Sequence, residues 1–189
     1  MNRKERFRRS AAALLLMLAL FSPMFAQSRQ AKGHVHVPVT APRPEDVGTL
    51  DGIIKAFYDV ISGPAGAPRQ WSRDRTLYIP EIKFVEVSRK NGKVSSEAMD
   101  HQTYVDRAND AMVKHGFYER EIHRAVQTFG AITHVFSTYE SRTTADGPVI
   151  ARGINSIELI NDGNRWWITF GQWADETPDS PIPPEFLPK

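Results

Sequence analysis

The 189-residue sequence contains no cysteine. Disulfide bonds, a thiol nucleophile, zinc sites built from cysteine and a lipid anchor on cysteine are therefore excluded. Because no covalent cross-link is available, a folded domain of this chain has to be stabilised by its core alone.

Long apolar runs are scarce, and the one that stands out is the eleven-residue stretch AAALLLMLALF at residues 11–21. A membrane-spanning helix needs about 20 such residues, so this run is short for one. It lies between the cationic segment MNRKERFRR and Met24-Phe25-Ala26, the order found in secretory signal peptides. We therefore expect residues 1–26 to be a signal peptide cleaved before Gln27, which makes the mature protein periplasmic or secreted, without a stable membrane anchor. An uncleaved N-terminal anchor is the alternative.

A surplus of positive charge is missing once this segment is set aside. The chain has 24 Lys and Arg against 22 Asp and Glu, but residues 1–26 hold five of the basic and one of the acidic residues. The other 163 residues carry 19 basic and 21 acidic side chains, a formal charge of −2. No basic surface remains to bind nucleic acid, and 163 residues suffice for one complete core.

Sites that require a fixed set of side chains are missing as well. The sequence shows no phosphate-binding loop, nucleophile triad or metal-ligand set, so we predict neither a cofactor nor a metal. His34 and His36 lack the third ligand that a metal site needs. Residues 27–45 around them are polar and contain three prolines, which favours a flexible leader.

Three helices are predicted. Apolar residues at helical spacing over residues 50–61, after the N-cap Thr49, predict the first. A shorter helix is predicted over residues 68–77. The third begins after the cap residue Asp100 and ends at Gly116, a residue type that readily closes a helix C-terminus.

Strands are predicted where apolar and polar residues alternate. Residues 82–96 form a predicted hairpin around Asn91-Gly92, the strongest short hairpin signal. Residues 117–173 contain four more alternating stretches, which predict an antiparallel meander. The turns between them are expected at Phe129-Gly130, Asp146-Gly147 and Asp162-Gly163.

The order of these elements predicts an α+β domain over residues 46–175. Its curved antiparallel sheet, made of the meander and the short hairpin, should wrap round three N-terminal helices in a cone-like arrangement with an internal pocket. Residues 176–189 are rich in proline and are predicted to be an extended C-terminal strap.

Two-residue turns throughout the meander would decide which side chains share a face. The face expected to line the pocket includes Glu121, His123, His134, Phe136, Thr138 and Asn155. The opposite face includes Val126, Val135, Tyr139, Ile154, Trp167 and Trp173. A single-residue bulge would exchange the two faces beyond it.

Four phrases in this order, GIIKAFYDVISG, FGAITHVFSTYESR, RGINSIEL and DGNRWWI, resemble the nuclear transport factor 2-like (NTF2-like) superfamily, which includes SnoaL-like cyclases, ketosteroid isomerase and scytalone dehydratase. The resemblance covers residues 49–173 and implies a cone with an internal pocket and frequent dimers through the sheet. Members include isomerases, dehydratases, cyclases and binders without activity, so the fold leaves the function open. The isomerase pattern is incomplete here: Phe57 takes the place of its helix tyrosine, with Tyr58 beside it, and only Glu86 lies near its general base.

Two functions follow as hypotheses. The first is binding of a small, partly hydrophobic molecule in the pocket. The alternative is a cofactor-free isomerase, dehydratase or cyclase, in which His123 and His134 act as general acid and base, as histidines do in dehydratase members. The competing interpretation is that His123 and His134 are partly buried, hydrogen-bonded to their neighbours and without a catalytic role. The expected ligand contacts are Tyr58, Tyr104, Asn155, Glu121, Thr138 and Phe136.

The outer sheet face predicts a homodimer. Six large apolar or aromatic residues would lie exposed on it, and monomers seldom expose a contiguous patch of that size. These residues are Val126, Val135, Tyr139, Ile154, Trp167 and Trp173. The alternative is that the strap folds back and covers the patch with Ile182, Phe186 and Leu187.

Overall fold

The computed structural model describes residues 33–189, so the predicted signal peptide and its cleavage site lie outside the described residues. Within this range no helix is long and apolar enough to cross a membrane. Four α-helices and six strands are followed by a short 3₁₀ helix, η1, in the strap. The helices are α1 (Pro44–Val47), α2 (Leu50–Asp59), α3 (Trp71–Arg75) and α4 (His101–His115).

The helix termini follow the local signals of the sequence. Thr49 accepts a hydrogen bond from the backbone N–H of Gly52 at 2.9 Å, and Asp100 accepts one from Thr103 at 2.8 Å, so both predicted N-caps are confirmed. Gly116 follows α4 with φ of 73°. Helix α1 was not predicted, although proline at its first position and two acidic residues in its first turn favour a helix start.

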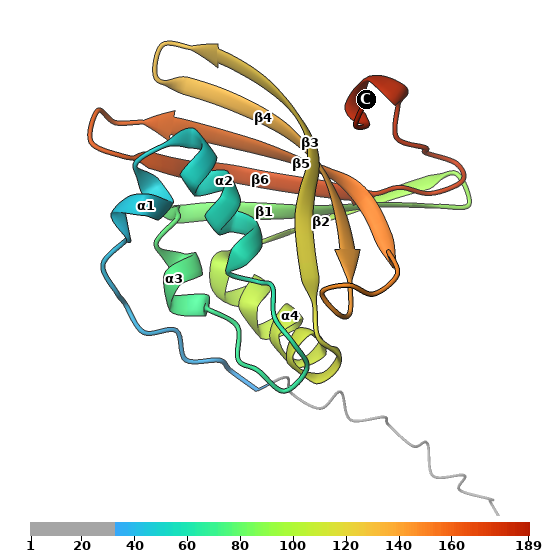
Figure 1. The fold of residues 1–189 in the computed structure, drawn as a ribbon, viewed down its shortest axis with the longest axis horizontal. Coiled ribbons are helices and arrows are strands. Elements are labelled where there is room, and N and C mark those ends of the chain that lie inside the picture. The colour runs from blue at the N-terminus through green and yellow to red at the C-terminus, as the bar shows by residue number, and fades with distance from the viewer. Residues whose placement is uncertain (1–32) are drawn as a thin grey trace, which may run out of the picture. The chain divides into compact units, whose positions relative to one another are not determined.

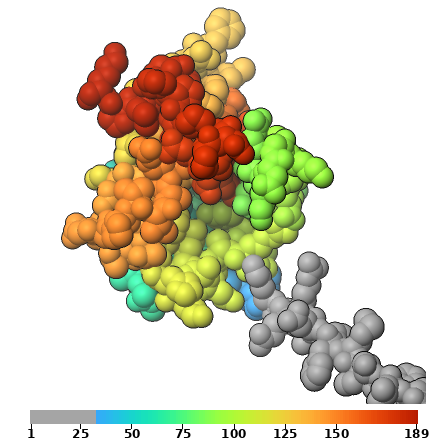
Figure 2. All heavy atoms as spheres, turned by 90° about the vertical axis from the view of Figure 1, so that its right-hand side faces the viewer, coloured from blue at the N-terminus to red at the C-terminus, as the bar shows by residue number. Residues whose placement is uncertain are grey.

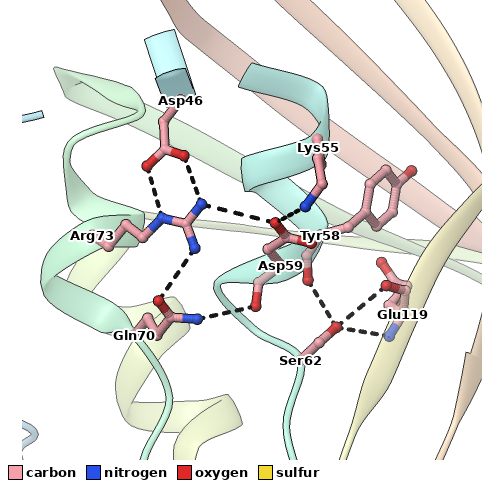
Figure 3. Close-up of polar contacts among 8 residues, drawn as sticks. All are labelled: Asp46, Lys55, Tyr58, Asp59, Ser62, Gln70, Arg73 and Glu119. Atoms are coloured by element: carbon pink, nitrogen blue, oxygen red, sulfur yellow. Dashed lines mark hydrogen bonds and ion pairs between the residues drawn. The ribbon is translucent and has the colours of Figure 1, made fainter. Parts of the chain in front are cut away.

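An ion pair joins the short helices, as Figure 3 shows. The guanidinium of Arg73 on α3 donates to both carboxylate oxygens of Asp46 on α1, at 2.7 and 2.6 Å. Asp46 is buried, and the hydrogen bonds from Arg73 hold its pKa below the usual value. This bidentate pair fixes α1, at the start of the domain, against α3.

The six strands form one mixed sheet in the order β2-β1-β6-β5-β4-β3 (Figure 1). All neighbours are antiparallel except β1 and β6, which run parallel, so the predicted α+β class is confirmed and the sheet is mixed where a wholly antiparallel one was expected. Asn91 and Gly92 have φ of 53° and 74°, as a tight hairpin turn between β1 and β2 requires. The strands are β1 (Tyr78–Lys90), β2 (Lys93–Met99), β3 (Tyr118–Phe129), β4 (Ile132–Arg142), β5 (Ala151–Asn161) and β6 (Trp166–Asp175).

The core lies between the sheet and the helices. We call the side of the sheet that packs on the helices the helix face and the other side the outer face. Ile53 and Ile54 of α2 are fully buried and belong to one hydrophobic cluster with residues of the four central strands. The sheet contributes Tyr78, Ile82, Phe84, Val135, Tyr139, Ile157, Leu159 and Ile168 to it.

The connection between β4 and β5 reverses the predicted faces of β4. A two-residue turn would pair residue 138 with Asn155, but the connection is longer, and Ser137 pairs with Asn155 instead. Because side chains alternate along a strand, this shift of one residue turns Val135, Ser137 and Tyr139 to the helix face. The predicted placement of His134, Phe136 and Thr138 on the pocket face is therefore wrong.

Two bulges complete the correction. The pairing of β3 with β4 shifts between Glu121 and His123, so Glu121 stays on the helix face while His123, opposite Thr138, lies on the outer face. The pairing of β5 with β6 shifts next to Leu159, and beyond it Trp173 pairs with Asn155 on the helix face. Of the predicted outer patch, Val126, Val135, Tyr139 and Trp173 thus lie on the helix face.

The C-terminal strap docks on the outer face, as the tail alternative predicted, but against Phe136 and Thr138, which are not members of the predicted patch. The Phe186 ring packs edge-on against Phe136, with ring centroids 4.9 Å apart, and the Thr138 hydroxyl donates to the Phe186 carbonyl at 2.6 Å. Ile182 is buried, and its N–H donates to Glu176. In Figure 1 this dark red segment lies across the sheet from α2. The strap therefore covers Phe136 and Thr138, two of the outward side chains of β4.

Candidate functional site

A pocket of about 420 Å³ opens on the helix face of the sheet. Its walls come from α2, α4 and all six strands, and Figure 2 shows the molecule hollowed between the green β1–β2 hairpin, yellow-green α4 and the orange start of β5. A volume of this size is in the range of small-molecule sites.

Seven aromatic side chains line the pocket. Tyr104 is the centre of this group, since its ring lies 5.1 Å from that of Phe84 and 6.1 Å from that of Trp173, measured between centroids. Such mutual packing holds the rings in place before any ligand arrives. The seven are Phe57, Tyr78, Phe84, Tyr104, Phe117, Tyr139 and Trp173.

Glu119, at the start of β3, places a carboxyl group in the lining of the pocket. Its backbone is anchored to the end of α2, because the N–H of Glu119 donates to Ser62 at 3.0 Å and the Ser62 hydroxyl donates to the Tyr58 carbonyl at 2.8 Å (Figure 3). Burial raises the pKa of the Glu119 carboxyl to about 8; the hydrogen bond from Asn155 opposes this rise, and the negative charge of Asp175 adds to it. At neutral pH this carboxyl is therefore largely protonated.

Asn155 connects the pocket to a buried chain of hydroxyl groups. Its amide donates to the Tyr58 hydroxyl at 3.1 Å, and Tyr58 and Ser137 share a hydrogen bond of 2.6 Å. Ser137 in turn donates to Glu121, which forms an ion pair with Arg124 at 2.6 Å. Burial raises the pKa of Tyr58, so its hydroxyl keeps its proton. This chain holds the Asn155 side chain in a single orientation.

Tyr139 and Asp175 form a second polar pair at the pocket wall. The Tyr139 hydroxyl donates to the Asp175 carboxylate, and burial together with this hydrogen bond raises the pKa of Tyr139. Gly153 makes room for the pair, because a Cβ atom at that position would come within 2.3 Å of the Tyr139 hydroxyl. Tight packing therefore requires glycine at position 153.

Behind the aromatic wall lies a buried acidic residue with two partners. Asp74, on α3, accepts a hydrogen bond from the Tyr78 hydroxyl at 2.8 Å and lies 2.8 Å from Nε2 of His101. Burial and the Asp74 charge raise the pKa of Tyr78 well above its usual value. This triad orients Tyr78, whose ring contributes to the wall.

The residues predicted for the site are divided among three places. Tyr104 and Asn155 line the pocket, and Tyr58 lies directly behind Asn155. Glu121 is on the helix face but is bound by Ser137 and Arg124 outside the pocket lining. The remaining four, His123, His134, Phe136 and Thr138, are on the outer face, where His134 hydrogen-bonds to Ser156 at 3.2 Å.

The sequence did not predict that Glu119, Tyr139 and Asp175 line the pocket. One signal was available for Glu119: it lies two residues before Glu121 on the same strand, so both acids belong to one face. No comparable signal existed for Asp175, because the bulge in β6 decides its orientation.

No protein-family model matches the chain, and no curated protein proved similar to it. Among solved structures, a protein of unknown function with a cystatin-like fold from Nostoc punctiforme has a TM-score of 0.49 at 7% identity, over 74% of this chain and 97% of that one. An NTF2-like protein of unknown function from Silicibacter pomeroyi has a TM-score of 0.41 at 14% identity, over 68% and 94% of the two chains. A candidate ketosteroid isomerase from Shewanella frigidimarina has a TM-score of 0.44 at 17% identity, over 66% and 94%. All three are distant likenesses, which assign this chain neither a superfamily nor a function.

Proposed function

We propose that this protein binds a small, partly aromatic molecule in the pocket of the helix face. The observation that carries the proposal is the pocket itself, with about 420 Å³ of space, seven aromatic side chains and a few polar groups. Mostly apolar walls with a small number of fixed polar groups are the usual composition of ligand sites. The rings supply contact area, and the polar groups select an orientation.

Glu119 and Asn155 suit a ligand with an oxygen or nitrogen substituent. With a pKa of about 8, the Glu119 carboxyl is a hydrogen-bond donor at neutral pH and an acceptor once ionised. Asn155 is held by Tyr58 and offers its remaining amide groups to the pocket. A ring carrying one polar substituent would therefore place its ring among the aromatic walls and its substituent beside Glu119.

Filling the pocket should weaken binding of a neutral aromatic probe. We expect calorimetry to detect binding of tryptophol, an indole with a hydroxyethyl chain, to the wild type. Ala108 of α4 lines the pocket, so Ala108→Phe should weaken this binding at least about 10-fold by occupying the space. Ala111→Phe is the matched control, since Ala111 is exposed on the same helix. Absence of tryptophol binding at millimolar concentration, or equal binding by both variants, would contradict the proposal.

Cofactor-free proton transfer is the second candidate function. The observation in its favour is that Glu119 has a pKa of about 8 inside the pocket, where a carboxyl can both give and take a proton near neutral pH. His123 and His134 have no part in this version, because they lie on the outer face. Catalysis would be indicated by a ligand that is chemically changed by the wild type and unchanged by Glu119→Gln; a ligand recovered intact from the wild type argues for binding alone.

Homodimerisation through the outer face stays a prediction. Ile154 and Trp167 of the original patch remain on this face, and Ile132 adds an apolar side chain that is 59% exposed. We expect light scattering to show a dimer of the described domain, and Trp167→Glu to dissociate it by placing a charge in the interface. The prediction is wrong if the wild type is monomeric at micromolar concentration or if Trp167→Glu leaves a dimer intact. The outer face would then be covered by the strap alone.

A further inference from the structure

We propose that the ligand of the pocket is an organic cation, an amine attached to an aromatic ring. This inference rests on the proposed binding function and specifies the ligand that the same pocket selects. Two independent features of the wall support it: an excess of carboxylates and a ring of aromatic faces. Each feature favours a positively charged nitrogen, and neither favours a carboxylate ligand.

The charges of the pocket lining are mostly negative. Three acidic residues, Glu86, Glu119 and Asp175, line the pocket, and Arg107 is its one basic residue. The guanidinium of Arg107 forms an ion pair with Glu97 of β2, which compensates its charge. Glu86 of β1 and Asp175 of β6 lie on different sides of this space, and Glu119 of β3 adds a further negative charge once it is ionised. An anionic ligand would be repelled from this cavity and a cation attracted.

The aromatic residues provide the second feature. Trp173 lies two residues before Asp175 on β6, and both side chains line the pocket. Tyr104 and Phe84 add further rings next to Trp173. A cation within reach of several aromatic faces gains attraction from their quadrupoles without losing contact area for its own ring. Rings and carboxylates together form the kind of site that holds ammonium groups.

The ionisation of Glu119 gives this binding a pH dependence. Titratable groups of four packed elements interact electrostatically with Glu119: Tyr58 of α2, Tyr104 of α4, Tyr139 of β4 and Asp175 of β6. Arg107 of α4 and Tyr78 and Glu86 of β1 line the same pocket. Because the pKa of Glu119 is about 8, an arriving cation would favour release of its proton. The affinity for a cation should therefore rise with pH, whereas a neutral ligand gains nothing from the ionised carboxyl.

Three indole probes of nearly equal size separate the alternatives: tryptamine, tryptophol and indole-3-acetate. At pH 8 we expect calorimetry to give about 10-fold tighter binding of tryptamine than of tryptophol, and the weakest binding for indole-3-acetate. From pH 6 to pH 8 the tryptamine affinity should rise about fivefold. Glu119→Gln and Asp175→Asn should reduce the preference for tryptamine while tryptophol binding changes little. Glu185→Gln, on the exposed strap, is the control.

The outcomes distinguish this inference from the function on which it rests. If tryptophol binds as well as tryptamine, or indole-3-acetate binds best, the pocket is a ligand site and the preference for cations is wrong. If the preference survives both Glu119→Gln and Asp175→Asn, the carboxylates are not its source, and the inference fails. If none of the probes binds, the proposed function and this inference fail together.

Discussion

Replacing Arg69 by methionine should lower the free energy of unfolding by about 3 kcal/mol, because buried carbonyl groups would lose their hydrogen-bond donors. Arg69 is only 6% exposed, and burial lowers its pKa. Its guanidinium donates to the backbone carbonyls of four residues in two separate segments. These are Ala67 at 3.1 Å, Gly63 at 2.9 Å, Pro64 at 3.3 Å and Met112 at 2.6 Å.

The position of these carbonyls explains the size of the expected effect. Met112 lies in the last turn of α4, where carbonyl groups have no partner within the helix. Arg69 supplies that partner and at the same time holds the loop after α2 against the end of α4. Methionine keeps much of the aliphatic volume of arginine but donates no hydrogen bond, so it isolates the loss of the donors.

Urea unfolding followed by tryptophan fluorescence measures this change. Arg89→Met is the matched control, since Arg89 is exposed near the tip of the β1–β2 hairpin, and it should change the unfolding free energy by less than about 0.5 kcal/mol. Arg69→Lys should fall between the wild type and Arg69→Met, because lysine keeps the charge but has fewer donors in a less suitable geometry. Equal stability of Arg69→Met and Arg89→Met would show that the four contacts contribute nothing net.

The second large effect is a dependence of stability on pH that originates at Glu119. In the folded protein its pKa is about 8, against a reference value of 4.5 for the unfolded chain. Between these two values the folded state binds a proton that the unfolded state has released, so the unfolding free energy falls as pH rises. The stabilising contribution is complete below about pH 4.5 and is lost as pH rises through about 8.

Glu119→Gln should remove this dependence, since an amide has no proton to lose in this range. Each pKa unit corresponds to about 1.4 kcal/mol, and access of solvent to a group at a pocket wall reduces the full value. We therefore expect the variant to gain on the order of 3 kcal/mol relative to the wild type between pH 5 and pH 9. The pH range of the comparison ends at pH 9, because the raised pKa values of Tyr58 and Tyr139 affect stability in more alkaline solution.

Urea unfolding at pH 5, 7 and 9 tests this expectation. Glu185→Gln, an exposed acid of the strap, should follow the wild-type curve at all three values. Parallel curves for wild type and Glu119→Gln would mean that Glu119 titrates in its ordinary range. Glu119 would then support neither the proton-transfer hypothesis nor the predicted pH dependence of cation binding.

Features that depend on neighbouring residues were determined by the sequence. The caps Thr49 and Asp100 and the turn at Asn91-Gly92 are satisfied by groups within a few positions along the chain, so their types alone predict them. Helical spacing also placed Tyr58 and Tyr104 on stripes that meet the sheet. The α+β class follows from the order of these elements, because the helices have to bury their apolar stripes against one face of the sheet.

The composition of the pocket was decided by the tertiary structure. The long β4–β5 connection and the bulges beside Glu121 and Leu159 each shift the strand pairing by one residue. Since the side-chain period of a strand is two, each shift exchanges inward and outward residues, which moved His123 and His134 out and brought Trp173 in. Contacts across the fold decide where such shifts occur: Asn155 and Tyr58, which lie 97 positions apart, become hydrogen-bonded partners only when α2 packs on the sheet.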